Sequence, residues 1–199
     1  MPVIFERSLP FVALMLITFL MAGCGNKQKP TPKPRGYFRI DLPEKSYTPL
    51  DIDCPYSFEY PSYSTIVRDP GKVGKPCWIN IHFPDFDGNI HISYKPVQGN
   101  LKTFTEDARN LAYKHTVKAE AISEQAFVNK EQQVYGIFYD LQGNVASPAQ
   151  FYLTDSSRHF IRGSLYFRTE PNQDSLDPVI RFVKEDMRHL METLQWQSR

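Results

Sequence analysis

The 199-residue sequence has little of the residue types that usually indicate catalysis or nucleic-acid binding. It contains three cysteines and five histidines, and its formal net charge is +1. A charge so close to zero gives no basis for proposing nucleic acid or a strongly charged substrate as a partner. The sequence also lacks a Gly-x-Ser-x-Gly elbow, a phosphate-binding glycine loop and a His-Glu-x-x-His pair. These absences exclude the enzyme classes that those motifs define.

No hydrophobic run is long enough for a permanent membrane span. The apolar stretch covers residues 9–22, about 14 residues, whereas a helix needs about 20 to cross a bilayer core. Such a length is typical of a secretory signal. The small residues Ala22 and Gly23 precede Cys24, which is the arrangement of a lipoprotein signal. We predict a signal peptide over residues 1–23 and acyl lipid, such as palmitate, on Cys24. The alternative is a buried helix with an incidental cysteine.

Residues 24–36 are rich in proline and lysine, which predicts a tether. Polyproline geometry extends about 3 Å per residue, so this segment could hold a domain about 30 Å from the bilayer. Its basic residues would favour anionic headgroups, although a plain solvated spacer explains them equally well. Residues 37–199 then suffice for a single domain with its own core, and neither a repeat nor a second linker divides them.

Two cysteines remain once Cys24 carries lipid. An even pair in an oxidising compartment usually forms a disulfide, so we predict that Cys54 and Cys77 are joined. Closing a loop of about 24 residues contributes about 3 kcal/mol on the chain-entropy estimate. Two free buried thiols or a metal site are the alternatives.

Alternating apolar and polar residues predict several strands, and helical spacing predicts two helices. The first helix follows a capping box at Thr103 and Glu106 and extends to about Val117. The second carries an apolar stripe from Leu176 to Leu194, is capped by Asp174 or Ser175, and turns Lys184 and other charged residues to water. The predicted strands are 37–43, 56–60, 65–67, 78–83, 89–94, 122–128, 133–141, 149–154 and 159–168.

This order predicts an α+β domain, a largely antiparallel twisted sheet with two main helices packed on it. It resembles PsbP-like α/β/α sandwiches, a comparison of folds that implies no function.

Two histidines are the strongest candidates for a metal site. His82 and His91 lie on the polar face of a predicted hairpin, and Asp85 and Asp87 lie near its tip. A turn centred on Asp87 and Gly88 would pair His82 with Ser93 and leave the histidines diagonal to each other. Two imidazoles and a carboxylate could share a metal, but no third spaced ligand follows, and solvated surface histidines are the commoner case.

Residues 155–159 contain an aspartate, two serines and a histidine, the residue types of a hydrolase triad. Neighbours in one tight turn cannot adopt the geometry that a nucleophile, its base and an orienting acid require. Turn capping by short polar side chains explains them better. We expect Trp78 and Trp196 to serve in core or rim packing.

Several short sequence segments, spread over the whole mature chain, together resemble the gliding-motility lipoprotein GldD family. None of these segments is a catalytic signature. Their order and density make the resemblance specific. They cover residues 34–43, 54–61, 76–80, 91–95, 113–115, 139–144, 150–156, 160–167 and 171–176.

The resemblance implies a non-enzymatic envelope lipoprotein required for gliding motility and type IX secretion. It implies a role in stabilising or assembling partner gliding lipoproteins, notably GldJ, with no catalytic residues and no cofactor. Only Cys24, the lipid attachment site, transfers residue by residue. For the partner surface, exposed aromatic and arginine residues on strands are the candidates, although each could instead pack internally: Tyr37, Arg39, Tyr166 and Arg168.

Residues 25–29 contain no acidic side chain. Acidic residues at this position are the usual surface-export signal in lineages with type IX secretion, so we expect a periplasm-facing lipoprotein, on the outer rather than the inner membrane. The main alternative function is a periplasmic small-ligand or glycan-binding lipoprotein, which requires a concave, aromatic-lined pocket of about 300 Å³ or more.

Overall fold

The structure is a computed structural model that describes residues 40–68, 77–114, 117–169 and 173–197. The predicted signal peptide, lipid site Cys24 and tether lie outside the described residues, as do Tyr37 and Arg39. None of the helices in the described ranges is both long and apolar enough to cross a membrane.

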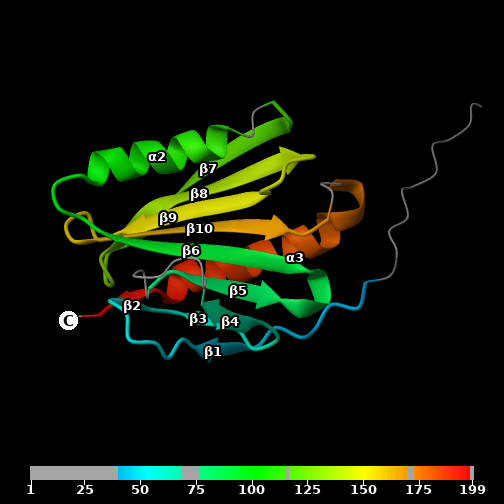
Figure 1. The fold of residues 1–199 in the computed structure, drawn as a ribbon, viewed down its shortest axis with the longest axis horizontal. Helices are drawn as coiled ribbons and strands as arrows, with labels where there is room; N and C mark the ends of the chain where they lie inside the picture. The colour runs from blue at the N-terminus through cyan, green and yellow to red at the C-terminus, as the bar shows by residue number, and fades with distance from the viewer. Residues whose placement is uncertain (1–39, 69–76, 115–116, 170–172, 198–199) are drawn as a thin grey trace, which may run out of the picture. The chain divides into compact units, whose positions relative to one another are not determined.

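A seven-stranded antiparallel sheet forms the centre of the described structure (Figure 1). Four of its strands form the meander that the sequence predicts, and each of these contacts its neighbour in the chain. In spatial order the strands are β4 (Thr65–Arg68), β5 (Ile79–Phe83), β6 (Gly88–Pro96), β10 (His159–Phe167), β9 (Ala149–Thr154), β8 (Val134–Gly143) and β7 (Ala119–Asn129).

Two short ribbons complete the strand pairing. β1 (Tyr47–Pro49) pairs with β3 (Glu59–Pro61), and β2 (Tyr56–Ser57) pairs with β11 (Gln195–Trp196). The predicted strand over residues 37–43 is wrong for its described part, because residues 40–43 are not in a strand. Ile40 packs against the core, but Leu42 is exposed and Pro43 has no N–H to donate to a ladder.

The hairpin of β5 and β6 has the predicted faces but a different turn. A 3₁₀ helix, Pro84–Phe86, starts immediately after β5, and Asp87 then adopts left-handed backbone with φ 46°. His82 therefore pairs with Asn89, and the predicted pairing with Ser93 is wrong. The physical reason is Pro84, whose fixed φ suits the first turn of a helix and not a continuing strand.

Helix α2 (Leu101–Tyr113) begins before the predicted capping box and ends before Val117, which is 93% exposed. The capping-box prediction is wrong, because Thr103 lies inside the first turn. Asn100 occupies the N-cap position but its side chain forms no cap hydrogen bond; its Oδ1 instead accepts the backbone N–H of Gln98 at 2.9 Å.

Helix α3 (Gln173–Thr193) carries the predicted apolar stripe, with Val183, Met187 and Leu190 buried. It begins before Asp174 and Ser175, so these residues are not its N-cap. Lys184 was predicted to face water, but it is only 9% exposed. Its ammonium lies 2.7 Å from the Asp140 carboxylate of β8. The long aliphatic part of a lysine side chain can lie buried while its charged end extends to a partner on a neighbouring element.

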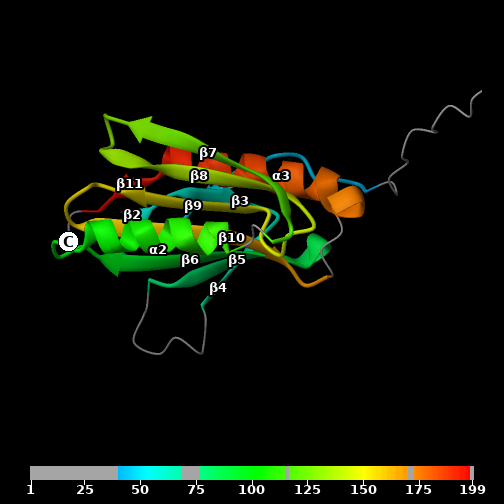
Figure 2. The ribbon, with the colours of Figure 1, turned by 90° about the horizontal axis from the view of Figure 1, so that it is seen from above.

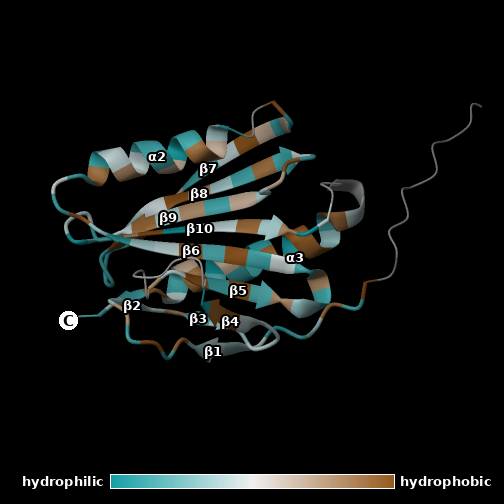
Figure 3. Ribbon diagram, in the orientation of Figure 1, coloured by the Kyte–Doolittle hydropathy of each residue, from teal (hydrophilic) through white to brown (hydrophobic). Residues whose placement is uncertain are grey.

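The two helices lie on opposite faces of the sheet (Figures 1 and 2). Successive residues of a strand point to opposite faces, and Figure 3 shows the resulting alternation of hydrophilic and hydrophobic residues along the strands. In β10, Ile161 and Leu165 join the core under α3, whereas Phe160 packs with Ala108 of α2. The α+β prediction, two helices on a largely antiparallel sheet, is confirmed.

Cys54 and Cys77 form the predicted disulfide, with Cα atoms 5.6 Å apart. Cys54 lies just before β2, and Cys77 lies just before β5. The Tyr56 hydroxyl also donates to the Cys77 carbonyl at 2.8 Å. The disulfide therefore fixes the β2–β11 ribbon to the central sheet.

Candidate functional site

A cavity of about 610 Å³ lies between α2 and the neighbouring part of the sheet. Helix α2 packs against β9 and β10, so the same face of β6 and β5 continues beyond the helix without a helical cover (Figure 2). We call this cavity the α2 groove. Its aromatic lining residues are Trp78, Phe104 and Phe160, and its polar and charged ones include Asn80, His91, Ser93, Lys95, Asp107, Lys114, Arg162 and Ser164.

Arg162 of β10 provides a half-buried cation on the sheet side of the α2 groove. Its Nη2 donates to Gln150 Oε1 at 2.6 Å, and its Nη1 lies 3.5 Å from the Ser164 hydroxyl. Burial lowers the pKa of the guanidinium, while the Tyr166 hydroxyl favours its charged form. Among the described residues, no carboxylate forms an ion pair with this guanidinium.

Gln150 of β9 is 1% exposed, and its Nε2 has no hydrogen-bond partner in the structure. Gln150 pairs across the ladder with Ser164, so both side chains point to the face of the sheet that α2 occupies. Because a guanidinium only donates hydrogen bonds, it orients the Gln150 amide with the oxygen toward Arg162 and the Nε2 group away from it. One amide donor is left over beside the α2 groove.

The predicted partner residues Tyr166 and Arg168 lie in a second hollow, of about 380 Å³, which we call the edge hollow. Asn80 and His91 line both this hollow and the α2 groove, so the two lie side by side. Arg168 is exposed and lies 3.8 Å from the Asp87 carboxylate. Tyr166 is half-buried, with its ring 5.5 Å from that of His91.

His82 and His91 lie on one face of the β5–β6 hairpin, as predicted, but one ring nitrogen of each lies within hydrogen-bond distance of an asparagine side chain. Nδ1 of His82 lies 3.1 Å from Asn89 Oδ1, and Nδ1 of His91 lies 2.6 Å from Asn80 Oδ1. No group of three metal-binding side chains gathers within the described part of the chain. The arrangement is a polar ladder across β5 and β6, which suits hydrogen bonding to a ligand or partner.

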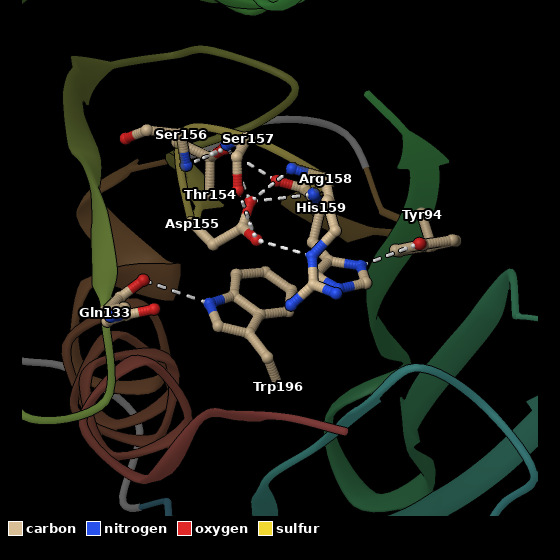
Figure 4. A network of polar contacts seen from close by, with 9 residues as sticks. All are labelled: Tyr94, Gln133, Thr154, Asp155, Ser156, Ser157, Arg158, His159 and Trp196. Carbon is tan, nitrogen blue, oxygen red and sulfur yellow. Dashed lines mark hydrogen bonds and ion pairs between the residues drawn. The ribbon is translucent and has the colours of Figure 1, made fainter. Parts of the chain in front are cut away.

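The segment 155–159 folds as a capped turn (Figure 4). Asp155 Oδ1 accepts the backbone N–H groups of Ser157, Arg158 and His159 at 2.8 to 3.0 Å. Burial acts to raise the pKa of Asp155, but these hydrogen bonds outweigh it and hold the pKa below its usual value. This is the turn capping that the sequence predicts, and it commits the carboxylate to the backbone.

The His159 side chain points away from the turn serines. Its Nδ1 lies 2.9 Å from the Tyr94 hydroxyl, and its ring stacks on Trp196 with centroids 5.1 Å apart (Figure 4). Burial lowers the pKa of this imidazole. Trp196 donates its indole N–H to the Gln133 carbonyl at 3.1 Å, so it packs as expected. Trp78 differs, because it forms part of the groove wall.

A separate polar cluster joins the segment after the predicted tether to α3. Asp186, whose side chain is fully buried, accepts Lys45 Nζ at 2.6 Å and the Tyr63 hydroxyl at 2.7 Å. Burial raises the pKa of the Asp186 carboxyl despite these hydrogen bonds. Lys45 also lies over the Phe182 ring, 3.4 Å from its centroid. The cluster holds β1 and β3 against the helix.

Sequence reasoning missed Arg162, Gln150 and Asp186. A signal for Asp186 was present, since it follows Val183 by three residues and precedes Leu190 by four, which places it on the apolar stripe. Arg162 carried a weaker signal, a lone charge within the apolar strand 159–167. Gln150 carried none, because its burial depends on which strands neighbour β9.

Comparison with known proteins shows the family. The solution structure of PsbP from the cyanobacterium Synechocystis is similar over 75% of this chain and 95% of its own, at 14% identity and a TM-score of 0.43. No curated protein sequence matches the chain. The model of the family described as gliding motility lipoprotein GldD matches residues 27–196. The chain therefore belongs to the gliding motility lipoprotein GldD family.

Proposed function

We propose that this lipoprotein is a non-enzymatic assembly factor that stabilises partner lipoproteins of the gliding and type IX secretion machinery, GldJ in particular. The family match over residues 27–196 carries the proposal. The lipid on Cys24 anchors the protein, the tether gives it reach, and the folded domain holds the partner. We place the anchor in the outer membrane, with the domain facing the periplasm.

The edge hollow and α2 groove together supply a suitable contact surface. Tyr166 offers a half-buried aromatic ring, and Arg168 offers an exposed guanidinium beside it. Aromatic and arginine side chains dominate the energetics of protein interfaces because they combine apolar area with directed hydrogen bonds. The commitment of Asp155 to backbone N–H groups supports the absence of hydrolase chemistry at the turn that contains the triad residue types.

Gene deletion with complementation tests the proposal. Deletion should lower the level of GldJ and abolish spreading and type IX secretion, and the wild-type gene should restore them. Cys24→Ala should fail to restore them, because the protein then carries no acyl lipid to anchor it in the outer membrane. The double variant Tyr166→Ala with Arg168→Ala should restore them poorly. Lys102→Ala on the exposed side of α2, where the lysine side chain is 88% exposed, is the matched control and should restore them fully.

Normal GldJ levels and normal secretion in the deletion strain would overturn the assembly role. Placement is tested separately, by separating inner and outer membranes and adding protease to intact cells. Recovery in the outer membrane with full protection from protease is the expected result. Cleavage in intact cells would contradict the periplasmic orientation.

The α2 groove favours a second candidate, a periplasmic small-ligand or glycan-binding lipoprotein. Its volume of about 610 Å³ lies within the range of small-molecule sites, about 300 to 1,000 Å³. Trp78, Phe104 and Phe160 give it the aromatic walls that this function needs. An assembly factor that only docks against a protein has no need of such a cavity.

A further inference from the structure

The Arg162 guanidinium is the feature of the α2 groove that the fold leaves uncompensated. It lies on β10, the central strand of the sheet, and among the described residues it interacts with the neutral side chains of Gln150, Ser164 and Tyr166. A buried charge is stable only when it is paired or fully hydrogen-bonded. Two other cations of the described chain differ: the buried Lys184 and the half-buried Lys45 each have an aspartate within 2.7 Å.

The surroundings of Arg162 supply further hydrogen-bond donors and positive charge. Ser164, which is 2% exposed, lines the groove beside the guanidinium, and Gln150, whose Nε2 is unpartnered, contacts Arg162 without lining the groove itself. Lys95 and Lys114 also line the groove, whereas Asp107 is the one carboxylate among the described residues that line it. Three permanent cations against one anion leave the cavity with an excess of positive charge.

The walls of the groove define the rest of a ligand. The Phe104 and Phe160 rings lie 5.4 Å apart between centroids, and the Lys95 ammonium lies 4.6 Å from the Phe104 centroid. The Trp78 indole N–H is committed to the Tyr94 carbonyl at 2.7 Å, which fixes the orientation of its ring. Such walls accept a flat or apolar body, while the cations accept a negative head.

We infer that the α2 groove binds a small molecule with an oxyanion head, a carboxylate or a phosphate, on a flat apolar body, and that Arg162 holds the head. A planar guanidinium matches either oxyanion with two parallel N–H···O bonds, which a neutral ligand cannot reproduce. This inference rests on the second candidate function, since it names the ligand chemistry of the same groove. It does not depend on the assembly role.

Calorimetric titration of the full lipidated protein in non-ionic detergent tests the inference. The probes are benzoate, indole-3-acetate and phenyl phosphate, each measured against its neutral amide or alcohol counterpart and against detergent alone. The charged probes should bind and the neutral ones should not. The ratio of carboxylate to phosphate affinities then identifies which oxyanion the groove prefers. This comparison needs no variant and so cannot fail through misfolding.

Arg162→Gln should weaken binding of the charged probes about tenfold or more, since it removes charge-assisted hydrogen bonds. Arg181→Gln is the matched control, because its guanidinium is an exposed one on α3, and it should leave the affinity unchanged. Equal affinity for charged and neutral probes, or an unchanged affinity in a folded Arg162→Gln protein, would overturn the oxyanion assignment while leaving a ligand pocket. No binding by any probe would overturn the assignment and the second candidate function together.

Discussion

The two faces of the central sheet differ in whether the cations beneath the covering helix have an anionic partner. Under α3, Lys184 is paired with Asp140, and the Asp186 carboxylate is paired with Lys45, within a continuous apolar core. Under α2, Arg162 lies among neutral groups beside a cavity. Burial of a charge is therefore not by itself a sign of function in this protein. At Arg162 the missing counter-charge coincides with a cavity, and the two observations together point to a ligand.

The largest expected difference between the two faces is in the stability lost when a packed apolar side chain of the covering helix is shortened. Met187 of α3 is fully buried, whereas Leu111 of α2 is 38% exposed. Met187→Ala should lower the free energy of unfolding by about 2–5 kcal/mol, because it leaves a cavity in a core that cannot collapse. Leu111→Ala should change it by only about 0.5 kcal/mol. Urea unfolding followed by circular dichroism measures both, and equal losses would contradict the comparison.

The Asp186 cluster should give the next largest effect. Asp186→Ala leaves Lys45 without its close partner and removes the acceptor of Tyr63, so we expect a loss of about 3 kcal/mol. Asp177→Ala is the control, since Asp177 pairs with the exposed Arg181 and should contribute at most about 1 kcal/mol. Similar losses in the two variants would show that the cluster is only a surface network.

Replacing Lys184 and Arg162 by methionine, one at a time, compares how much a cation on each face of the sheet contributes to stability. Lys184→Met leaves Asp140 unpaired and should lower the free energy of unfolding by about 2 kcal/mol. Arg162→Met leaves no carboxylate behind but removes the donor to the buried Gln150 Oε1, so we expect a smaller loss of about 1 kcal/mol. Chemical denaturation at pH 7 is the measurement. A larger loss for Arg162→Met would mean that Arg162 serves mainly to hold β9 and β10 together.

The smallest expected effect is a pH dependence from His159. Burial lowers the pKa of this imidazole in the folded state, with Asp155 opposing and Arg158 adding to the shift. Below about pH 6.5 the unfolded chain binds a proton that the folded protein does not, so stability should fall as the pH decreases through that value. His159→Gln should reduce this fall. Unfolding curves at pH 7.5 and 5.5 give the slopes, and identical slopes would rule out the shift.

Sequence patterns predicted most of the fold because most of the chain obeys simple periodicity. The apolar stripe that includes Val183, Met187 and Leu190 predicted α3, and the alternation of apolar and polar residues predicted the meander. The wrong predictions concern turns and helix ends, where a single residue decides the local backbone conformation. Pro84 converted a tight turn into a 3₁₀ helix, and Asn100 ended up at the α2 N-cap in place of Thr103.

The candidate site was less accessible from sequence than the fold. Tyr166 and Arg168 were identified as strand residues with suitable chemistry, and the structure places them in one hollow. Arg162 and Gln150 come from strands β10 and β9, and their contact arises only once the two strands pair. No periodicity in one strand reports the charge of its neighbour, so an uncompensated cation becomes visible only in three dimensions.

The pairing of β2 with β11 ties together two segments from far apart in the chain. Tyr56 faces Trp196, and the Gln197 N–H bonds the Pro55 carbonyl at 3.0 Å. A chain made and exported from its N-terminus exposes β2 long before its partner exists. The β2–β11 pairing beside the disulfide can therefore form only after residues 195–196 have been made and exported. Loss of residues 195–197 would leave β2 without its partner strand, and the disulfide would then hold an unpaired segment.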